Sequence, residues 1–195
     1  NLHVSNCNFI GTDVGLRFKS TRGRGGVVEN VYISDINMID IPSQAISFDL
    51  YYGGKSIAEK LAEGGSSTVN AAVPVTEETP QFKNISIKNV TISGAQQAVF
   101  LQGLPEMNLE NIEISNLTAK ADKGFSIIDA NGIKIHNVKL DIKEPTVFEI
   151  YNGQNLSLKN IEFKVTSSKA ITINGAVSEN IELIYERKKK KKEVE

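Results

Sequence analysis

An Arg-x-Lys pair lies near the start of the chain, within residues 14–20. Apolar and polar residues alternate there, which is typical of a strand with one buried face. Leu16 and Phe18 would then point to the core, and Arg17 and Lys19 would point outward on the same side. Arginine offers a planar fork of donors and lysine a point charge, so the pair could hold a carboxylate or a phosphate. The same pair is also consistent with an ordinary solvated strand face.

The composition is that of a globular chain without a strong overall charge. The chain has 195 residues, of which 40% are hydrophobic, and a formal net charge of −1 at pH 7. This length is enough for one domain with a sizeable core, and the balanced charge gives no general attraction for nucleic acid. No apolar run is as long as a membrane span. Cys7 is the only cysteine and no Cys–His cluster is visible, so we expect no disulfide, metal, cofactor, nucleic-acid partner or membrane partner.

A short pattern recurs along the chain. Most copies have an asparagine, two apolar residues at period two, an Asn or Asp, and then a second apolar pair. The first apolar residues of the copies are Leu2, Val31, Ile85, Ile112, Ile133, Leu156 and Ile181. By subtraction these positions are separated by 29, 54, 27, 21, 23 and 25 residues. One step is therefore double and the others are near 25, a length typical of stacked repeats.

The repeat predicts an all-β fold. The period of two within each apolar pair indicates short strands, and the phase shift between pairs indicates a bend at the Asn or Asp, which tolerate the left-handed region. A third strand follows in each unit. Three short strands per turn, stacked in parallel, predict a right-handed parallel β-helix, a solenoid of about seven coils. The bend residues should form a hydrogen-bonded ladder along one corner, made of Asn6, Asp35, Asn89, Asn116, Asn137 and Asn160.

The doubled step of the repeat holds an insertion at about residues 53–80. Within it, residues 56–63 have helix formers behind a serine N-cap and end at a Gly-Gly pair, which predicts one short helix followed by a loop. Long loops on a rigid scaffold often shape binding sites, but this one could equally be a plain surface excursion. We expect residues 1–185 to form the β-helix and the charged residues 186–195 to form a solvated or frayed tail.

Three segments resemble the family 28 glycoside hydrolases, which are the polygalacturonases and related pectin-cleaving enzymes. Gly-Leu-Arg-Phe-Lys-Ser with the following Arg-Gly-Arg-Gly-Gly, at residues 15–26, is similar to the Arg-x-Lys region of that family. Residues 28–52 and 98–107 resemble the bacterial members of the family. The likeness covers most of residues 1–185. The family fold is a right-handed parallel β-helix. The resemblance implies a secreted or periplasmic bacterial parent protein that hydrolyses galacturonate-containing polysaccharide with inversion.

The resemblance also implies which residues bind substrate. In the family, the Arg and Lys of the motif hold the galacturonate carboxylate beside the scissile bond. A tyrosine one coil further on commonly shapes this subsite, but its best positional match here is Gln44, so nearby tyrosines are suggested as substitutes. The substrate-binding candidates are therefore Arg17, Lys19, Tyr51 and Tyr52, with Asp49 and Gln102 as secondary candidates.

The catalytic motifs of the family are not found in this sequence. Its Asn-x-Asp, Asp-Asp and Gly-His-Gly motifs precede Arg-x-Lys, and none of them occurs here. Inverting hydrolysis needs one carboxylic acid and one carboxylate. No such pair can be assigned among Asp13, Asp35, Asp40 and Asp49, so no catalytic residue is identified. We therefore interpret the chain as the C-terminal portion of a glycosidase, inactive alone, whose exposed coil edge self-associates or joins a missing N-terminal part.

Two other classes of protein stay open at this point. A pectate lyase shares the fold but needs a calcium site of clustered carboxylates, and no such cluster is visible on one outward face. A non-catalytic β-helix module, for polysaccharide binding or adhesion, would bind saccharides without cleaving them. The sequence immediately before Asn1 would discriminate between these classes, because it would either contain the three catalytic motifs or lack them.

Overall fold

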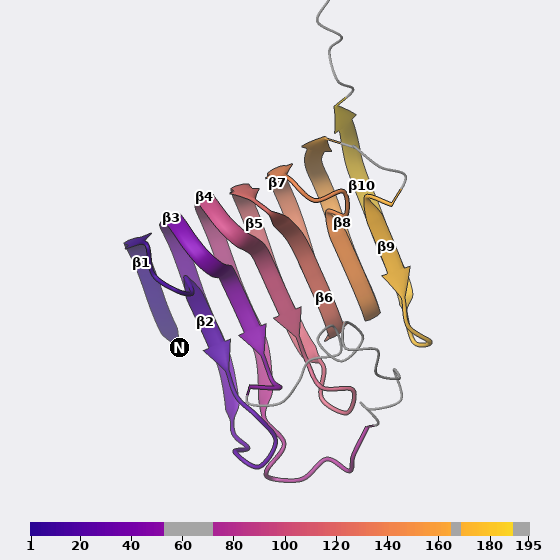
Figure 1. Cartoon of the computed structure of the whole chain (residues 1–195). Coiled ribbons are helices and arrows are strands. Elements are labelled where there is room, and N and C mark those ends of the chain that lie inside the picture. The colour runs from indigo at the N-terminus through magenta and orange to yellow at the C-terminus, as the bar shows by residue number, and fades with distance from the viewer. Residues whose placement is uncertain (53–71, 165–168, 189–195) are drawn as a thin grey trace, which may run out of the picture.

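The computed structural model describes residues 1–52, 72–164 and 169–188, and all regular structure in these ranges is β-strand. The strands are β1 (Leu2–Ile10), β2 (Leu16–Lys19), β3 (Val27–Asp49), β4 (Gln81–Gln102), β5 (Leu109–Ala121), β6 (Lys123–Asn131), β7 (Lys134–Ile142), β8 (Phe148–Lys164), β9 (Ile171–Asn174) and β10 (Glu179–Lys188). Figure 1 shows them side by side, from β1 at one end to β9 and β10 at the other. The helix expected at residues 56–63 lies outside the described residues.

Five of these strands form a closed ring through parallel pairing. The first part of β4 pairs with β5 and its last part pairs with β6. In the same way, β8 pairs with β6 through its first part and with β7 through its later part. Because β5 also pairs with β7, the pairings form the ring β4–β5–β7–β8–β6. Outside the ring, β3 pairs with β4 and carries β1 and β2, while β9 and β10 pair with β8.

This closed five-stranded parallel barrel with outer strands corrects the expected fold. The prediction of a right-handed β-helix, with about seven coils of three short strands, was wrong in its class. The strands are long: β3 has 23 residues and β4 has 22. They continue through the expected corners, where Asp35 and Asn89 adopt φ angles of 57° and 55°. Pairing continues with the same neighbour on both sides of these two bends, and β4 changes its partner from β5 to β6 further along, between Ser93 and Gln97.

The first apolar residues of the repeat lie in one row across the strands. The register aligns Leu2 with Val31, and Val31 with Ile85. The members of the row that are at most 2% exposed are Val31, Ile85, Ile112, Ile133 and Leu156. The row is open at its two ends, because Leu2 on the outer strand β1 is 56% exposed and Ile181 on β10 is only partly buried. Five of the seven residues that the repeat placed in the core are therefore buried, whereas the prediction was wrong for Leu2.

Asparagine side chains form ladders between neighbouring strands. The expected ladder is present from Asp35 through Asn160, with donor–acceptor distances of 2.9–3.1 Å. Asn6 does not join it, because its amide donates to Ser5 instead. A second set of ladder bonds, which the sequence analysis did not predict, joins Asn111 to Asn84, Asn155 to Asn131, and Asn180 to Asn155. These bonds satisfy the amides of residues held at positive φ.

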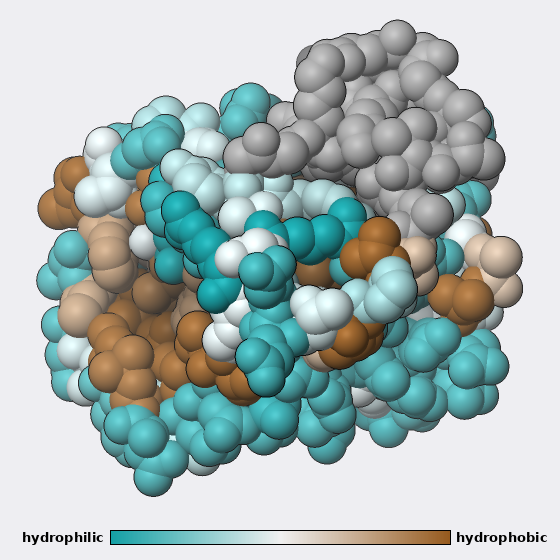
Figure 2. Space-filling model, turned by 90° about the horizontal axis from the view of Figure 1, so that it is seen from below, coloured by the Kyte–Doolittle hydropathy of each residue, from teal (hydrophilic) through white to brown (hydrophobic). Residues whose placement is uncertain are grey.

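Two features lie at the ends of the molecule. Strand β10 continues to Lys188 and pairs there with Lys164, so the strand includes the first residues of the segment expected to be a tail. At the β1 end, apolar side chains lie open in the space-filling view (Figure 2), and Leu2 and Ile10 are 56% and 68% exposed. No helix in the described ranges is long and apolar enough to cross a membrane.

Candidate functional site

Strand β2 presents its two cations outward, as the alternation predicts. Leu16 is buried and Arg17 and Lys19 are exposed. Phe18 points inward, where its ring stacks on that of Phe48 with 4.2 Å between centroids. Because two apolar side chains are anchored in the core, turning the strand over would bury both charges, which costs several kcal/mol for each. The fold therefore fixes the side of the sheet on which the cations stand.

Neighbouring strands continue this outward face. The register sets Ser47 of β3 beside Arg17, and Asp49 of β3 beside Lys19. Asp49 accepts a hydrogen bond from the backbone N–H of Tyr51 at 2.7 Å, which fixes the chain just after the strand. Gln102 lies beside Asp49 on β4 and is fully buried. Gln102 is aligned with Lys19 and Asp49, as expected for a candidate. Because it is buried, it offers no surface to a ligand.

Tyr52 lies against the two cations. The Cζ atom of Arg17 is 5.1 Å from the centroid of the Tyr52 ring, and the Nζ atom of Lys19 is 4.2 Å from it. A hydrogen bond from Lys19, followed by the charges of Lys19 and Arg17, holds the pKa of Tyr52 below its ordinary value. Neither cation forms an ion pair with a carboxylate among the described residues. The structure thus brings together three of the four main candidates as one exposed cation cluster, Arg17–Lys19–Tyr52.

Tyr51, the fourth candidate, is buried and contacts a different cation, Arg22. Its side chain is only 8% exposed, and burial raises the pKa of its hydroxyl to about 12. The guanidinium of Arg22 lies over its ring, 5.2 Å from the centroid. The hydroxyl has no hydrogen-bond partner in the part of the chain that the structure describes. Tyr51 therefore lies in a buried wall beneath Arg22 and offers little surface to a ligand.

An ion pair that the sequence analysis missed supports this wall. Arg22 donates from Nε and Nη2 to the two carboxylate oxygens of Glu106, at 2.6 and 2.8 Å. Burial, the largest single effect, would raise the pKa of Glu106, but the hydrogen bonds from Arg22, backbone hydrogen bonds and the charge of Arg22 together outweigh it and hold that pKa below its ordinary value. The pair joins the loop between β2 and β3 to the turn between β4 and β5. The two residues are 84 positions apart, so no local pattern in the sequence connects them.

Asp129 is a second buried acid that sequence reasoning did not find. It is 1% exposed, and its Oδ1 atom accepts a hydrogen bond from the Asn152 amide at 2.8 Å. Its Oδ2 atom has no hydrogen-bond partner among the described residues. Burial raises the pKa of Asp129 to about 6. Ile127, Ile128, Asp129 and Ala130 are all buried, so no inward and outward alternation marks Asp129 as an enclosed acid.

Of the four acids considered for catalysis, Asp49 is the one that the register aligns with a residue of the cation cluster, Lys19. Asp35 forms part of the asparagine ladder, where it also accepts a hydrogen bond from Ser34. Asp13 and Asp40 are exposed, and Asp49 caps the backbone of Tyr51. Within the described residues, no group of three or more His, Cys, Asp or Glu side chains could hold a metal ion. The arrangement can bind an anionic group but does not show a pair of carboxylates placed for hydrolysis.

Comparisons with known proteins add no family to this description. No protein-family model, no curated protein and no solved structure matches the chain. The likeness to family 28 glycoside hydrolases, which depends on the short motifs around Arg17 and Lys19, therefore stays a prediction.

Proposed function

We propose that the chain binds an acidic polysaccharide at Arg17, Lys19 and Tyr52, as the C-terminal part of a pectin-degrading glycoside hydrolase of the polygalacturonase type. The observation that carries the proposal is the grouping of two cations over one tyrosine ring on an exposed face, where neither cation forms an ion pair in the described part of the chain. The motif likeness supplies the enzyme class, and with it a secreted or periplasmic location in a bacterium.

The chemistry of the cluster fits a uronic acid residue. The guanidinium of Arg17 can donate two parallel hydrogen bonds to a carboxylate, and Lys19 adds a point charge beside it. The ring of Tyr52 provides a flat apolar surface for the C–H groups of a sugar, with a hydroxyl at its edge. Since the strand fixes both cations before the ligand arrives, little ordering free energy is lost on binding.

A non-catalytic polysaccharide-binding module is the second candidate function. It is favoured by the positions of the described acids, because none of them forms a pair across the cation cluster. In that case the same three residues would bind the acidic saccharide and no bond would be cleaved. The two candidates share the binding site and differ only in whether catalytic carboxylates are supplied to it.

Binding of trigalacturonate, followed by backbone amide NMR shifts, tests the shared part of the proposal. We expect saturable shifts at the amides of residues 17–20 and Tyr52, and no such shifts with the neutral trisaccharide maltotriose. Arg17→Ala or Lys19→Ala should weaken binding at this site about ten- to a hundredfold, because a charge-assisted hydrogen bond contributes about 1.5–3 kcal/mol. Lys120→Ala, which removes an exposed lysine elsewhere on β5, is the matched control.

Two results would contradict the binding proposal. Unchanged affinity in both single variants would show that the cations are an ordinary solvated face. A large fall in Tm in both variants would show that they act in folding rather than in binding. A reducing-sugar assay on polygalacturonate separates the two candidate functions for this chain, and we expect no release of reducing ends.

A further inference from the structure

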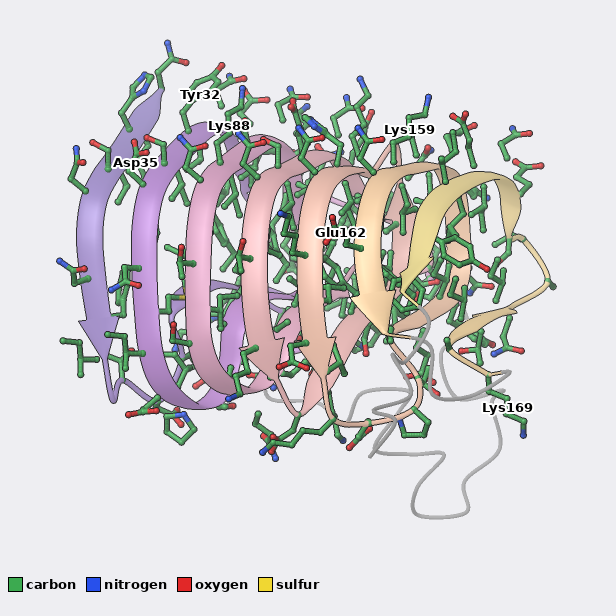
Figure 3. All side chains as sticks on the ribbon, turned by 90° about the horizontal axis from the view of Figure 1, so that it is seen from above. Tyr32, Asp35, Lys88, Lys159, Glu162 and Lys169 are labelled. Atoms are coloured by element: carbon green, nitrogen blue, oxygen red, sulfur yellow. The ribbon has the colours of Figure 1, made fainter. Side chains whose placement is uncertain are left out.

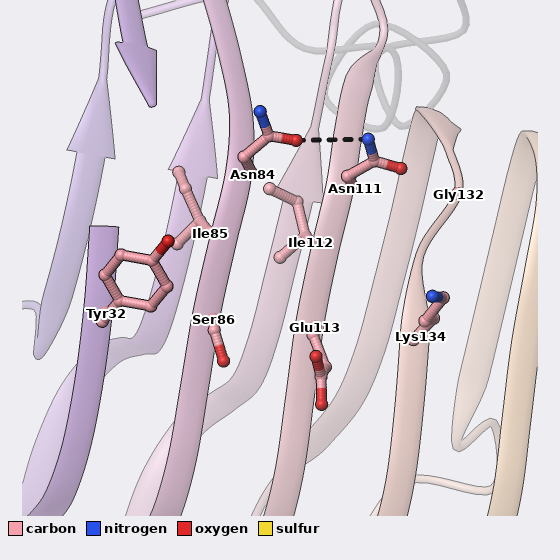
Figure 4. A pocket seen from close by; sticks show the side chains of 9 residues that line it. All are labelled: Tyr32, Asn84, Ile85, Ser86, Asn111, Ile112, Glu113, Gly132 and Lys134. Carbon is pink, nitrogen blue, oxygen red and sulfur yellow. Dashed lines mark hydrogen bonds between the residues drawn. The ribbon is translucent and has the colours of Figure 1, made fainter. Parts of the chain in front are cut away.

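A second part of the surface holds a polar pocket that shares no residue with the cation cluster. Its volume is about 390 Å³, and its walls come from β3, β4, β5 and the start of β7 (Figure 4). An aromatic ring lies on one side and two charged side chains lie on the other. A cavity of this size is within the usual range for small-molecule sites.

The register explains why a hollow forms at this place. It aligns Tyr32 with Ser86, Ser86 with Glu113, and Glu113 with Lys134, one residue from each strand. With neighbouring strands about 4.8 Å apart, the row from Tyr32 to Lys134 spans roughly 14 Å. Ser86 is the only small side chain in this row, and Gly132 at the rim adds none, so a depression is left between the larger side chains.

Tyr32 forms the aromatic wall of the pocket. It is 43% exposed and points outward from the sheet (Figure 3). Its ring stacks on His3 of β1, with 4.9 Å between centroids and 17° between planes. Because His3 covers the side of the ring toward β1, the opposite side turns toward β4 and the pocket. A ring fixed in this way offers a preformed apolar face to the C–H groups of a sugar.

The other lining residues provide hydrogen bonds and one positive charge. Ser86 contributes only its small size, because its hydroxyl oxygen is buried. The carboxylate of Glu113 lies 3.1 Å from Nε2 of His136, which holds it in place. Lys134 is exposed and forms no ion pair in the part of the chain that the structure describes. Asn111 donates to Asn84 at 3.2 Å on the upper rim.

We propose that this pocket binds an acidic saccharide, with one sugar ring stacked on Tyr32, hydroxyl groups at Glu113, and a carboxylate at Lys134. Glu113 accepts hydrogen bonds from sugar hydroxyls and repels ligands of high negative charge such as polyphosphates. A single carboxylate can still pair with Lys134 at the far side of the row. The ligand class follows from the residues of the pocket alone, so it does not depend on the activity proposed for the cation cluster.

The test uses the full chain with Arg17→Ala and Lys19→Ala together, so that the cation cluster no longer contributes. We expect trigalacturonate to shift the backbone amides of Tyr32, Ser86, Glu113 and Lys134 in this variant. Adding Tyr32→Ala or Lys134→Gln should weaken the interaction about tenfold or more, whereas Tyr32→Phe should preserve it. Lys139→Gln removes another exposed lysine from the same strand and serves as the matched control.

The outcomes separate this proposal from the one on the cation cluster. Loss of all trigalacturonate binding in the Arg17→Ala, Lys19→Ala variant would contradict binding at the pocket and would be consistent with binding at the cation cluster. Equal binding of maltotriose would overturn the acidic specificity given to Lys134. If Tyr32→Ala leaves the affinity unchanged, in a variant whose Tm shows that it is folded, the proposed stacking of a sugar ring on Tyr32 is wrong.

Discussion

At the scale of single residues, Asp129 combines burial with an incomplete set of hydrogen bonds. Only one of its carboxylate oxygens has a partner among the described residues, and that partner is the neutral amide of Asn152. The ionised form loses its hydration on folding, which raises the pKa of Asp129 from 3.8 to about 6. A carboxyl whose pKa rises on folding binds its proton more tightly in the folded state. Its ionisation therefore destabilises the protein as the pH rises.

This loss of stability with rising pH leads to a prediction for Asp129→Asn. The wild-type protein should lose stability through this group between about pH 4 and pH 6, by at most roughly 3 kcal/mol for a shift of about two pKa units. Asparagine cannot ionise, and its oxygen can still accept from Asn152, so the variant should be more stable than the wild type at pH 7. Urea unfolding at pH 3.5 and pH 7 measures this. An equal difference between the two proteins at both pH values would contradict the assigned pKa.

The sequence predicted the direction of some candidate side chains and could not predict others. For Arg17 and Lys19, alternation within the strand was sufficient, because Leu16 and Phe18 had to face the core. Tyr51 and Tyr52 follow the end of β3, so alternation carries no information there, and only one of the two tyrosines reaches the cluster. Gln102 occupies the expected row but is buried, and the packing that covers it depends on residues distant in the sequence.

At the scale of elements, the asparagines at positive φ allow a strand to bend without ending. Asn116 has a φ of 54°, donates to Asn89 at 2.9 Å and accepts from Asn137 at 3.1 Å. A left-handed conformation is disfavoured for most residues, and asparagine tolerates it. Each ladder residue therefore makes two contributions, one through its backbone conformation and one through its side-chain hydrogen bonds.

Two substitutions at Asn116 separate these contributions. Asn116→Gly removes both ladder bonds and keeps a residue that adopts positive φ readily, so we expect a loss of about 1–2 kcal/mol in the free energy of unfolding. Asn116→Ala removes the same bonds and adds backbone strain, so its loss should be larger by about 1 kcal/mol. Urea unfolding measures both variants. Equal stability of the two variants would show that the backbone conformation contributes little.

The repeat pattern also explains why the fold class was predicted incorrectly. Period two and the position of Asn or Asp define which side chains face inward and where the chain bends. They do not define whether pairing stops at a bend. In β4 the partner changes from β5 to β6 between Ser93 and Gln97, and in β8 it changes from β6 to β7 between Gln154 and Ser157, and this exchange of partners closes the ring. Closure is a property of hydrogen bonds between distant strands, which a local pattern does not contain.

At the scale of the whole molecule, the β1 end presents an uncovered apolar surface. Strand β1 pairs with β3 on one side only, within the described part of the chain. Leu2 and Ile10 are largely exposed there, and Val4, Cys7 and Phe9 are only partly buried. An unpaired strand edge beside apolar side chains favours association with another chain.

We therefore predict that the isolated chain self-associates through its β1 end. Light scattering after size exclusion should show a dimer or larger species that dissociates on dilution. Ile10→Lys adds a charge to this surface and should shift the equilibrium toward the monomer, because burying an unpaired charge in an apolar interface is costly. Val73→Lys changes an exposed apolar residue outside the strands and should leave the association unchanged. A stable monomer at high concentration, or an Ile10→Lys protein that associates as strongly as the wild type, would show that copies of the chain do not meet at this surface.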